Sequence, residues 1–398
     1  MPAIRQLPGM RDETPRELGH RTSLQEILHE NLSSHGYKAI DTPLIESTEL
    51  FLRKSGVELS TSMYTFTDPG GSRVSLRPEF TSSVIRYYLE RVSEETLPMR
   101  IQYSGPVFRY DHASGLKQFH QAGAEIIGTA STESDGEILA LAQDGLFLMG
   151  SPVSSFVVGH VGVLHLILDE IGISHRGQDF LIASLTSLKQ NPDESQKIQE
   201  RAYALGFMKS EETAFPSNTL LDDMEEEEAL SLLQDIFHSS LSGIQGSRSM
   251  KDILTRFIQK LKRGDDSKKI EHGISLFSRL ASIKGEEEQA LSQIRTTLKD
   301  YGISQSVIIP LEDVLASFHK RCPSTPLVID IGLVRGIAYY TGMVFEILGT
   351  GPNGPITLCG GGRYDGLVKA IGRGPDVPAI GFAYTMESIL SLSPENLT

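Results

Sequence analysis

Apolar and polar positions follow two different periods in the first 150 residues. Between residues 18 and 35 the apolar side chains recur at intervals of three and four positions, which predicts an amphipathic helix. These apolar residues are Leu24, Ile27, Leu28 and Leu32. Residues 101–111 and 119–127 alternate instead and are separated by a short polar loop, which predicts an antiparallel hairpin of two strands. Pro43, within residues 41–46, marks an edge strand or a bend.

The pattern changes at about residue 166 and stays helix-rich up to about residue 319. An acidic run occupies residues 222–228 and a basic run residues 260–263, while small polar residues at 243–247 and 264–267 predict loops. We interpret the acidic run as a solvated helix face or loop, because runs of like charge usually face water.

Strand patterns return in the last part of the chain. Residues 327–333 and 339–348 predict strands, and residues 381–392 predict a helix. Between them the chain is rich in glycine, at residues 349–354 and 359–367.

Strands on both sides of a helical segment indicate one α+β core that an insertion interrupts. We therefore expect residues 1–165 and 322–398 to form the core, and residues 166–321 to form a helical insertion domain. No internal repeat is visible in the sequence.

Composition narrows the class of protein. The 398 residues are 39% hydrophobic and 22% charged, which is ordinary for a soluble globular protein. We expect no membrane span and no signal peptide, since the chain has no long apolar run and its first residues are already charged. Cys322 and Cys359 make neither a disulfide framework nor a metal-ligand pattern, so we expect a cytoplasmic protein.

Charge lowers the expectation of a nucleic-acid partner. The chain has 37 basic and 51 acidic residues and a net charge of −14. A protein that holds a polyphosphate backbone usually carries a basic face, so we do not expect tRNA binding.

A polar strand face is the first candidate site. Gln121, Gly123 and Glu125 share one face of the second hairpin strand, because side chains alternate along a strand. On the facing strand, Arg109 points to one side. An amide and a carboxylate beside the open volume of a glycine suit a small zwitterion. The same pattern fits a solvent-exposed strand face equally well, and both interpretations stay open at this point.

Two further segments place polar residues beside turns. Glu79 and Thr81 precede a predicted helix, where Glu79 could accept hydrogen bonds from an α-ammonium group, although the pattern favours capping with Thr81 as the N-cap. Arg335 could fork onto a carboxylate or phosphate, and Tyr340 could offer its hydroxyl to an imidazole, although a tyrosine pair usually packs. The glycines of residues 360–366 lack the Lys-Ser/Thr of a P-loop.

Taken in order, these segments resemble the histidyl-tRNA synthetases, a class II family. The resemblance covers about residues 1–165 and 325–398, and the pair of histidine-specific motifs is its most diagnostic part. The matching segments are the start at 8–12, motif 1 at 36–46, motif 2 at 108–111 and 118–125, the histidine-specific motifs at 333–342 and 360–367, and motif 3 at 379–387.

The resemblance implies an antiparallel sheet flanked by helices and a pocket for L-histidine. It places Glu79 and Thr81 at the α-ammonium group, Gln121 at the backbone end of the ligand, and Glu125 with Tyr340 at the imidazole. It also implies these further histidine-binding residues: Phe80, Arg109, Arg335 at the carboxylate, and Tyr339 as lining.

The chain also departs from the family pattern. Ser388 follows Glu387 where the family places an ATP-clamping arginine, and Ala338 stands where an aspartate is expected. The motif 2 loop at 112–117 is short and offers only Lys117 as a cation. Because 11 residues follow Glu387, we expect no anticodon-binding domain.

Together, these departures imply that the chain is not an enzyme and has no catalytic residue, metal or cofactor. We expect it to be the regulatory subunit of ATP phosphoribosyltransferase, needed for the first step of histidine biosynthesis and binding L-histidine for feedback inhibition. Motif 1 implies a homodimer, here within a hetero-oligomer with the short-form catalytic subunit. The alternatives are a divergent histidyl-tRNA synthetase or histidine-activating enzyme, and a synthetase paralogue with another binding role.

Overall fold

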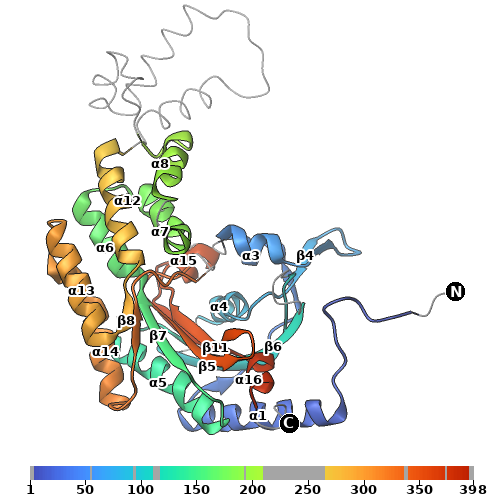
Figure 1. Ribbon diagram of the computed structural model, residues 1–398. Helices are drawn as coiled ribbons and strands as arrows, with labels where there is room; N and C mark the ends of the chain where they lie inside the picture. Colours follow the sequence, from blue (N-terminus) through green and yellow to red (C-terminus); the bar gives the residue numbers. More distant parts are fainter. Residues whose placement is uncertain are drawn as a thin grey trace, which may run out of the picture. The chain divides into compact units, whose positions relative to one another are not determined.

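The computed structural model describes residues 4–53, 56–92, 96–110, 117–191, 194–208, 265–335, 339–372 and 374–393. The chain forms two compact units. Unit 1 comprises Met1–Leu164, Ile283–Thr296 and Gln305–Thr398, and unit 2 comprises His165–Ser282 and Thr297–Ser304. Figure 1 shows the elements of each unit, coloured along the sequence.

Unit 1 is built on a large sheet that is mainly antiparallel. Within the described residues the sheet has nine strands in the order β1-β5-β6-β12-β11-β10-β7-β9-β8. The pairs β1–β5 and β7–β9 are parallel, and every other pair of neighbours is antiparallel. The strands are β1 (Lys38–Ala39), β5 (Met99–Phe108), β6 (Gln118–Ile127), β7 (Ser155–His160), β8 (Lys284–Glu286), β9 (Val328–Asp330), β10 (Met343–Gly351), β11 (Gly354–Arg363) and β12 (Ala379–Thr385).

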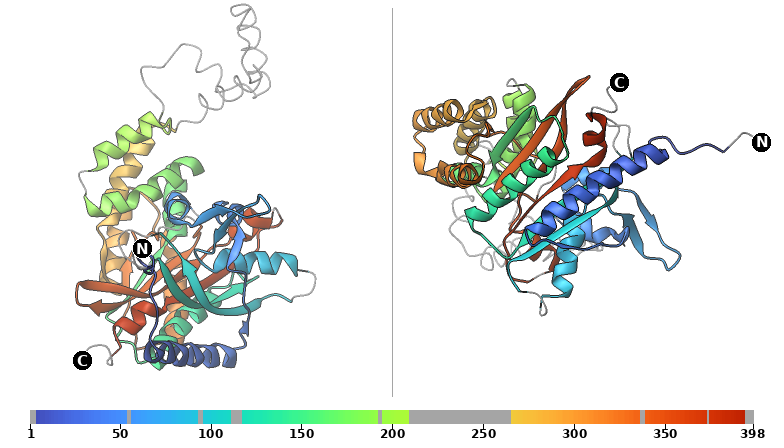
Figure 2. Two further views of the ribbon diagram at one scale, coloured as in Figure 1. Left: turned by 90° about the vertical axis from the view of Figure 1, so that its right-hand side faces the viewer. Right: turned by 90° about the horizontal axis from the view of Figure 1, so that it is seen from below.

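Two long helices cover one face of this sheet. Helices α1 (Pro15–Ser34) and α5 (Thr132–Leu148) lie side by side there, as the right-hand view of Figure 2 shows. Helix α1 begins at a capping box in which Thr14 accepts from the Glu17 backbone and the Glu17 side chain accepts in return. The Tyr384 hydroxyl of β12 donates to the Leu141 carbonyl of α5 at 3.0 Å.

The opposite face packs against shorter helices. Helices α4 (Thr81–Glu90) and α15 (Leu367–Gly372) contribute Val84, Ile85, Tyr88, Leu367 and Val368 to a buried cluster. The strands contribute Ile101, Tyr103 and Val107 of β5 to the same cluster. Because side chains alternate along β5, these odd-numbered residues face α4 while Gln102 faces α1. The candidate site lies on this α4 side of the sheet.

A small three-stranded sheet and several helices complete unit 1. The small sheet has the order β2-β4-β3. The remaining elements are β2 (Ile45–Ser47), β3 (Thr65–Thr67), β4 (Arg73–Leu76), α2 (Thr48–Leu52), α3 (Gly56–Ser62), α13 (Glu287–Asp300, which ends in unit 2), η2 (Gln305–Ile308), α14 (Ile309–Arg321) and α16 (Met386–Ser391). Helix α14 packs against α5.

Unit 2 has a helical core of its own. Its helices are α6 (Val161–Ile171, which begins in unit 1), α7 (His175–Gln190), α8 (Ser195–Ala204) and α12 (Ser267–Ala281). Helix α12 begins at Asp266, whose carboxylate caps the Lys268 amide at 2.8 Å. Its buried residues Ile270, Ile274 and Phe277 recur at intervals of three and four, so one apolar stripe faces the core.

The predicted antiparallel sheet flanked by helices is confirmed, and so are its main local elements. The hairpin exists as β5 and β6, paired from Met99–Ile127 to Phe108–Gln118. The amphipathic helix exists as α1 and buries Leu24, Leu28 and Leu32. Within the described residues, no helix combines the length and the apolar character that a membrane span requires.

One predicted element differs from the structure. The helix predicted for residues 381–392 is wrong in its first part, because residues 379–385 form strand β12 between β6 and β11. Gly381 of β12 pairs closely with β6, and a Cβ atom at this position would lie 1.5 Å from the Glu125 carboxylate. This pairing between strands makes the segment a strand, and side-chain periodicity does not reveal it. Residues 305–321 cluster with unit 1 through α14.

Some predictions fall outside the described residues. These are the acidic run at 222–228, the basic run at 260–263 and the loop at 243–247. The assignment of residues 166–321 to an insertion domain stays a prediction.

One buried ion pair generates a stability prediction. Arg363 of β11 and Asp135 of α5 are 7% and 2% exposed and form two parallel hydrogen bonds of 3.0 Å. Replacing one partner leaves a buried charge unpaired, so Arg363→Met should lower the free energy of unfolding in urea by about 3–5 kcal/mol. Arg295→Met removes an exposed pair with Glu312 and should cost less than about 1 kcal/mol. Equal losses in the two variants would contradict this account.

Candidate functional site

Seven of the nine residues predicted to bind histidine line one polar cavity in unit 1. They are Glu79, Thr81, Arg109, Gln121, Arg335, Tyr339 and Tyr340. They come from the first residue of α4 and the segment before it, from β6, and from loops beside β5 and β10. The sheet therefore brings together segments that are more than 200 positions apart in the sequence.

Glu125 of β6 lies directly behind the cavity wall and is 1% exposed. Its carboxylate accepts hydrogen bonds from the Thr81 hydroxyl at 2.8 Å, from the Tyr103 hydroxyl at 3.0 Å, and from the Tyr364 hydroxyl. Burial raises the pKa of Glu125 to about 7, although the three hydroxyl donors act in the opposite direction. The carboxyl group is thus poised to exchange a proton near neutral pH.

Glu79 occupies the start of helix α4 and is 3% exposed. Its carboxylate accepts from the Ser82 amide at 3.1 and 3.2 Å, so Glu79 serves the unpaired amides of the first helical turn. Burial raises the pKa of Glu79. The prediction that Thr81 is the N-cap is wrong: the N-cap position is Phe80, and the Thr81 hydroxyl turns to Glu125 instead.

Two guanidinium groups line the same cavity. Arg109 donates from Nε to the Pro78 carbonyl at 2.8 Å, and burial lowers its pKa while the Glu79 carboxylate opposes that shift. Arg335 donates from Nη1 to Glu346 at 3.1 Å. The buried Nε of Arg335 has no hydrogen-bond partner among the described residues. A buried donor without a partner is costly, so this nitrogen is available to an acceptor on a ligand.

A glycine in β11 makes room for Arg335. A Cβ atom on Gly360 would lie 1.6 Å from the Arg335 Nη1, so any other residue would displace the guanidinium. Gly361 is equally confined by the Gly381 carbonyl at 2.1 Å. Strand β12 therefore pairs with β11 at a point where a side chain on Gly361 would not fit.

Aromatic rings form another part of the cavity wall. Tyr339 and Tyr340 have ring centroids 4.9 Å apart, and Tyr364 meets Tyr339 edge-on at 5.4 Å. Burial raises the pKa of all three hydroxyls, so each is a neutral hydrogen-bonding group at physiological pH.

Sequence reasoning missed Tyr103 and Tyr364, both of which donate to Glu125. Tyr103 could have been found, because alternation along the strand places it on the same side as Arg109. Phe80 was predicted to bind histidine but does not line the cavity. It lies behind the wall and stacks on Tyr103 with ring centroids 4.4 Å apart.

The structure describes some of the positions at which the sequence departs from the family pattern. Glu387 accepts from the His120 amide at 2.8 Å and lies 2.9 Å from the His120 Nδ1, so its carboxylate is tied to β6. Ser388 accepts a hydrogen bond at its carbonyl from Ser391. The Lys117 ammonium lies 4.1 Å from the centre of the Tyr110 ring. Residues 111–116 and Ala338 are outside the described residues.

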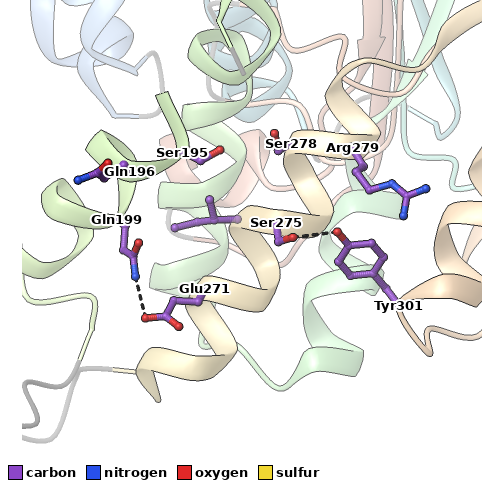
Figure 3. Close-up of a pocket in the computed structure, with 9 residues that line it drawn as sticks. Ser195, Gln196, Gln199, Glu271, Ser275, Ser278, Arg279 and Tyr301 are labelled. Atoms are coloured by element: carbon purple, nitrogen blue, oxygen red, sulfur yellow. Dashed lines mark hydrogen bonds between the residues drawn. The ribbon is translucent and has the colours of Figure 1, made fainter. Parts of the chain in front are cut away.

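A second cavity, of about 730 Å³, lies in unit 2 and is shown in Figure 3. Two pairs of its polar side chains are joined by hydrogen bonds: Gln199 donates to Glu271 at 2.7 Å, and the Ser275 hydroxyl lies 2.8 Å from the Tyr301 hydroxyl. No residue predicted to bind histidine lines this cavity. Across the described parts of both units, no group of three or more His, Cys, Asp or Glu side chains could hold a metal ion.

Comparisons with known proteins place these motifs in a family. The histidyl-tRNA synthetase family model matches residues 9–205 and 233–389. The chain is 32% identical to the histidine–tRNA ligase of Methanocaldococcus jannaschii over 385 residues, which cover 96% of this chain and 74% of that protein. It is 28% identical to the histidine–tRNA ligase of Sulfolobus acidocaldarius, over 95% of this chain and 72% of that protein.

Solved structures agree with this fold. The chain resembles the ATP phosphoribosyltransferase regulatory subunit/histidyl-tRNA synthetase from Bacillus halodurans with a TM-score of 0.68 at 21% identity, covering 99% of this chain and 84% of that chain. It also resembles the histidine–tRNA ligase subunit from Alicyclobacillus acidocaldarius, with a TM-score of 0.57 at 23% identity and 98% coverage of each chain. At these identities the likeness shows the fold, and the expected class II fold is confirmed.

One expectation from the sequence is corrected by these relatives. The prediction that the chain is not an enzyme is wrong, because relatives that match 96% of its length are named histidine–tRNA ligase, which is an enzyme. That prediction rested on several departures from the family pattern together: Ser388, Ala338, the short motif 2 loop and the expected absence of an anticodon-binding domain. The chain belongs to the histidyl-tRNA synthetase family.

Proposed function

We propose that the polar cavity binds L-histidine and that the chain activates this amino acid for transfer to tRNA. The observation that supports the proposal best is the separation of charges in and directly behind one cavity. The Glu79 carboxylate and the guanidinium groups of Arg109 and Arg335 line the cavity. A second carboxylate, Glu125, lies directly behind the wall, where it accepts from the Thr81 hydroxyl. Such an arrangement offers a partner to each ionisable group of histidine.

In this arrangement the imidazole ring would face Glu125. A carboxyl group with a pKa of about 7 is close to an imidazole, whose ordinary pKa is about 6.5, so one proton would be shared between the two groups through a hydrogen bond. The Tyr340 hydroxyl would meet the second ring nitrogen. Thr81, Tyr103 and Tyr364 occupy the remaining lone pairs of the carboxylate, which fixes its orientation toward the ligand.

The other end of the ligand would lie between Glu79 and Arg335, with Gln121 at the backbone end. Activation joins the histidine carboxylate to the α-phosphate of ATP and releases pyrophosphate. Attack by a tRNA hydroxyl then forms the ester and releases AMP. The unpaired Nε of Arg335 would stabilise the negative charge that develops on the phosphate.

A second candidate is a histidine-responsive role in an ATP phosphoribosyltransferase complex. Two observations favour it: Ser388 stands where the family places an arginine, and the Bacillus halodurans protein of similar fold is named as a regulatory subunit of that enzyme. In this role a homodimer of the chain would join a short catalytic subunit. Histidine would then lower the activity of the complex by binding two of its states with different affinity.

Histidine affinity should depend on the Glu125 carboxylate. Calorimetry at pH 8 should detect binding of L-histidine, and Glu125→Gln should weaken it at least about tenfold, because the amide lacks the negative charge that would accept a hydrogen bond from the imidazole N–H. Glu137→Gln is a matched control, since Glu137 is a paired carboxylate beside Arg100 on the α1 side of the sheet. It should change the affinity less than about twofold. Undiminished binding by Glu125→Gln would contradict the orientation proposed here.

Stability should depend on pH through the same group. A pKa raised from 4.5 to about 7 favours the folded state below pH 4.5, and this contribution disappears as the pH rises through 7. The loss is on the order of 3 kcal/mol at 1.36 kcal/mol per pKa unit. Urea unfolding at pH 5 and pH 8 should therefore show a smaller decline for Glu125→Gln than for the unmodified chain. Parallel declines in the two proteins would show that Glu125 keeps an ordinary pKa.

One pair of assays separates the two candidate functions. Histidine-dependent exchange of pyrophosphate into ATP is expected from the activating enzyme. The regulatory candidate predicts instead that mixing the chain with a short catalytic ATP phosphoribosyltransferase raises phosphoribosyl-ATP synthesis, and that histidine then suppresses it. Exchange without any effect on the transferase would exclude the second candidate, and the reverse result would exclude the first.

A further inference from the structure

A column of three side chains stands behind the cavity wall. The Arg77 guanidinium carbon lies 3.9 Å from the centre of the Phe80 ring. The Phe80 ring lies parallel to the Tyr103 ring, with centroids 4.4 Å apart and planes inclined by 10°. The Tyr103 hydroxyl then donates to Glu125 at 3.0 Å. All four residues are at most 4% exposed.

The outer end of the column is held by backbone carbonyls. Arg77 donates from Nε to Pro106 at 2.9 Å and from Nη1 to the Thr42 carbonyl at 2.5 Å. The Thr42 hydroxyl lies 3.2 Å and the Asp41 carboxylate 3.4 Å from the same Nη1. The Asp41 side chain is 84% exposed, so the column joins a surface segment to the buried Glu125. Burying a guanidinium is costly, and here it is compensated by several acceptors and a ring face.

The backbone is shaped to admit the column. A Cβ atom on Gly105 would lie 2.5 Å from the Arg77 Nη2 and 3.2 Å from the Phe80 ring. A Cβ atom on Gly123 would lie 2.7 Å from the Tyr103 hydroxyl, so the phenol ring also sits close to the backbone of β6. The Tyr103 ring is thus confined by Phe80 and by the Gly123 backbone and cannot tilt without moving one of them.

We propose that Arg77 is a positioning residue for the ligand site: it holds Phe80 against Tyr103 and so keeps the Tyr103 hydroxyl on Glu125. This inference rests on the proposed binding of histidine. It also gives Phe80 a role that differs from the predicted one, because Phe80 supports the site from behind without lining it. Arg77 itself does not touch the cavity.

A double-mutant cycle tests whether Arg77 acts through Tyr103. Calorimetry with L-histidine should show that Arg77→Met and Tyr103→Phe each weaken binding about fivefold to twentyfold. If the two residues act in series, the double variant should be no more than about threefold weaker than Tyr103→Phe alone, because the second change removes a support that no longer has a function. Independent effects would multiply. Arg77→Lys keeps a cation beneath the ring and should recover part of the affinity.

The matched control is Arg86→Met on helix α4. Arg86 is also a paired arginine, donating to Glu46 at 2.7 and 3.0 Å, but it makes no hydrogen bond or ring contact with the column. Its loss should leave histidine affinity within about twofold. Phe80→Leu keeps the hydrogen bonds of Arg77 and removes only the stacked ring, so it replaces Arg77→Met if circular dichroism shows that the latter does not fold.

Three outcomes are distinguishable. Weakened binding with strong non-additivity supports the positioning role. Folded Arg77→Met or Phe80→Leu with unchanged affinity, or effects that multiply with those of Tyr103→Phe, would overturn it while leaving the histidine site intact. If the unmodified chain binds no histidine, the proposed function fails and this inference fails with it.

Discussion

The burial of one carboxyl group constrains most of the described site. Glu125 lies between two strands of an antiparallel sheet, where β12 approaches so closely that Gly381 has no room for a side chain. A carboxylate that is only 1% exposed needs hydrogen-bond donors from the protein, because burial without them is costly. Three hydroxyls supply them, from α4, β5 and the segment after β11. The close strand pairing, the glycine and the hydroxyl donors together allow this carboxylate to be buried.

Side-chain periodicity in the sequence predicted the elements whose burial is itself periodic. The hairpin and helix α1 follow from side-chain periodicity, and the shared face of Gln121 and Glu125 follows from strand geometry. Strand β12 was missed, because its glycine and alanine residues fit the close approach of the neighbouring strands and do not form an amphipathic pattern. Likewise, the Arg77 column joins residues that only the tertiary fold brings together. No spacing in the sequence announces such a contact.

Most of the predicted site residues came from the family resemblance, and their shared cavity is a structural finding. The resemblance was less reliable for chemistry. Several departures from the family pattern, Ser388 among them, predicted the loss of enzyme activity, but relatives named as enzymes match almost the whole chain. Several groups in an active site share the electrostatic stabilisation of the transition state. Replacing one cation therefore lowers the reaction rate but does not show whether the protein is an enzyme. The same cavity therefore fits catalysis and sensing, and separate assays must decide between them.

The raised pKa of Glu125 affects how histidine binding to the cavity would depend on pH. Free histidine near neutral pH is a mixture of imidazole and imidazolium, and the unoccupied carboxyl group is a similar mixture of acid and anion. In the proposed complex either form of the ligand would meet a complementary form of Glu125, and the two complexes would differ only in which atom carries the shared proton. The fraction of sites occupied by histidine would then follow the total histidine concentration, and small changes in pH near neutrality would alter that fraction little.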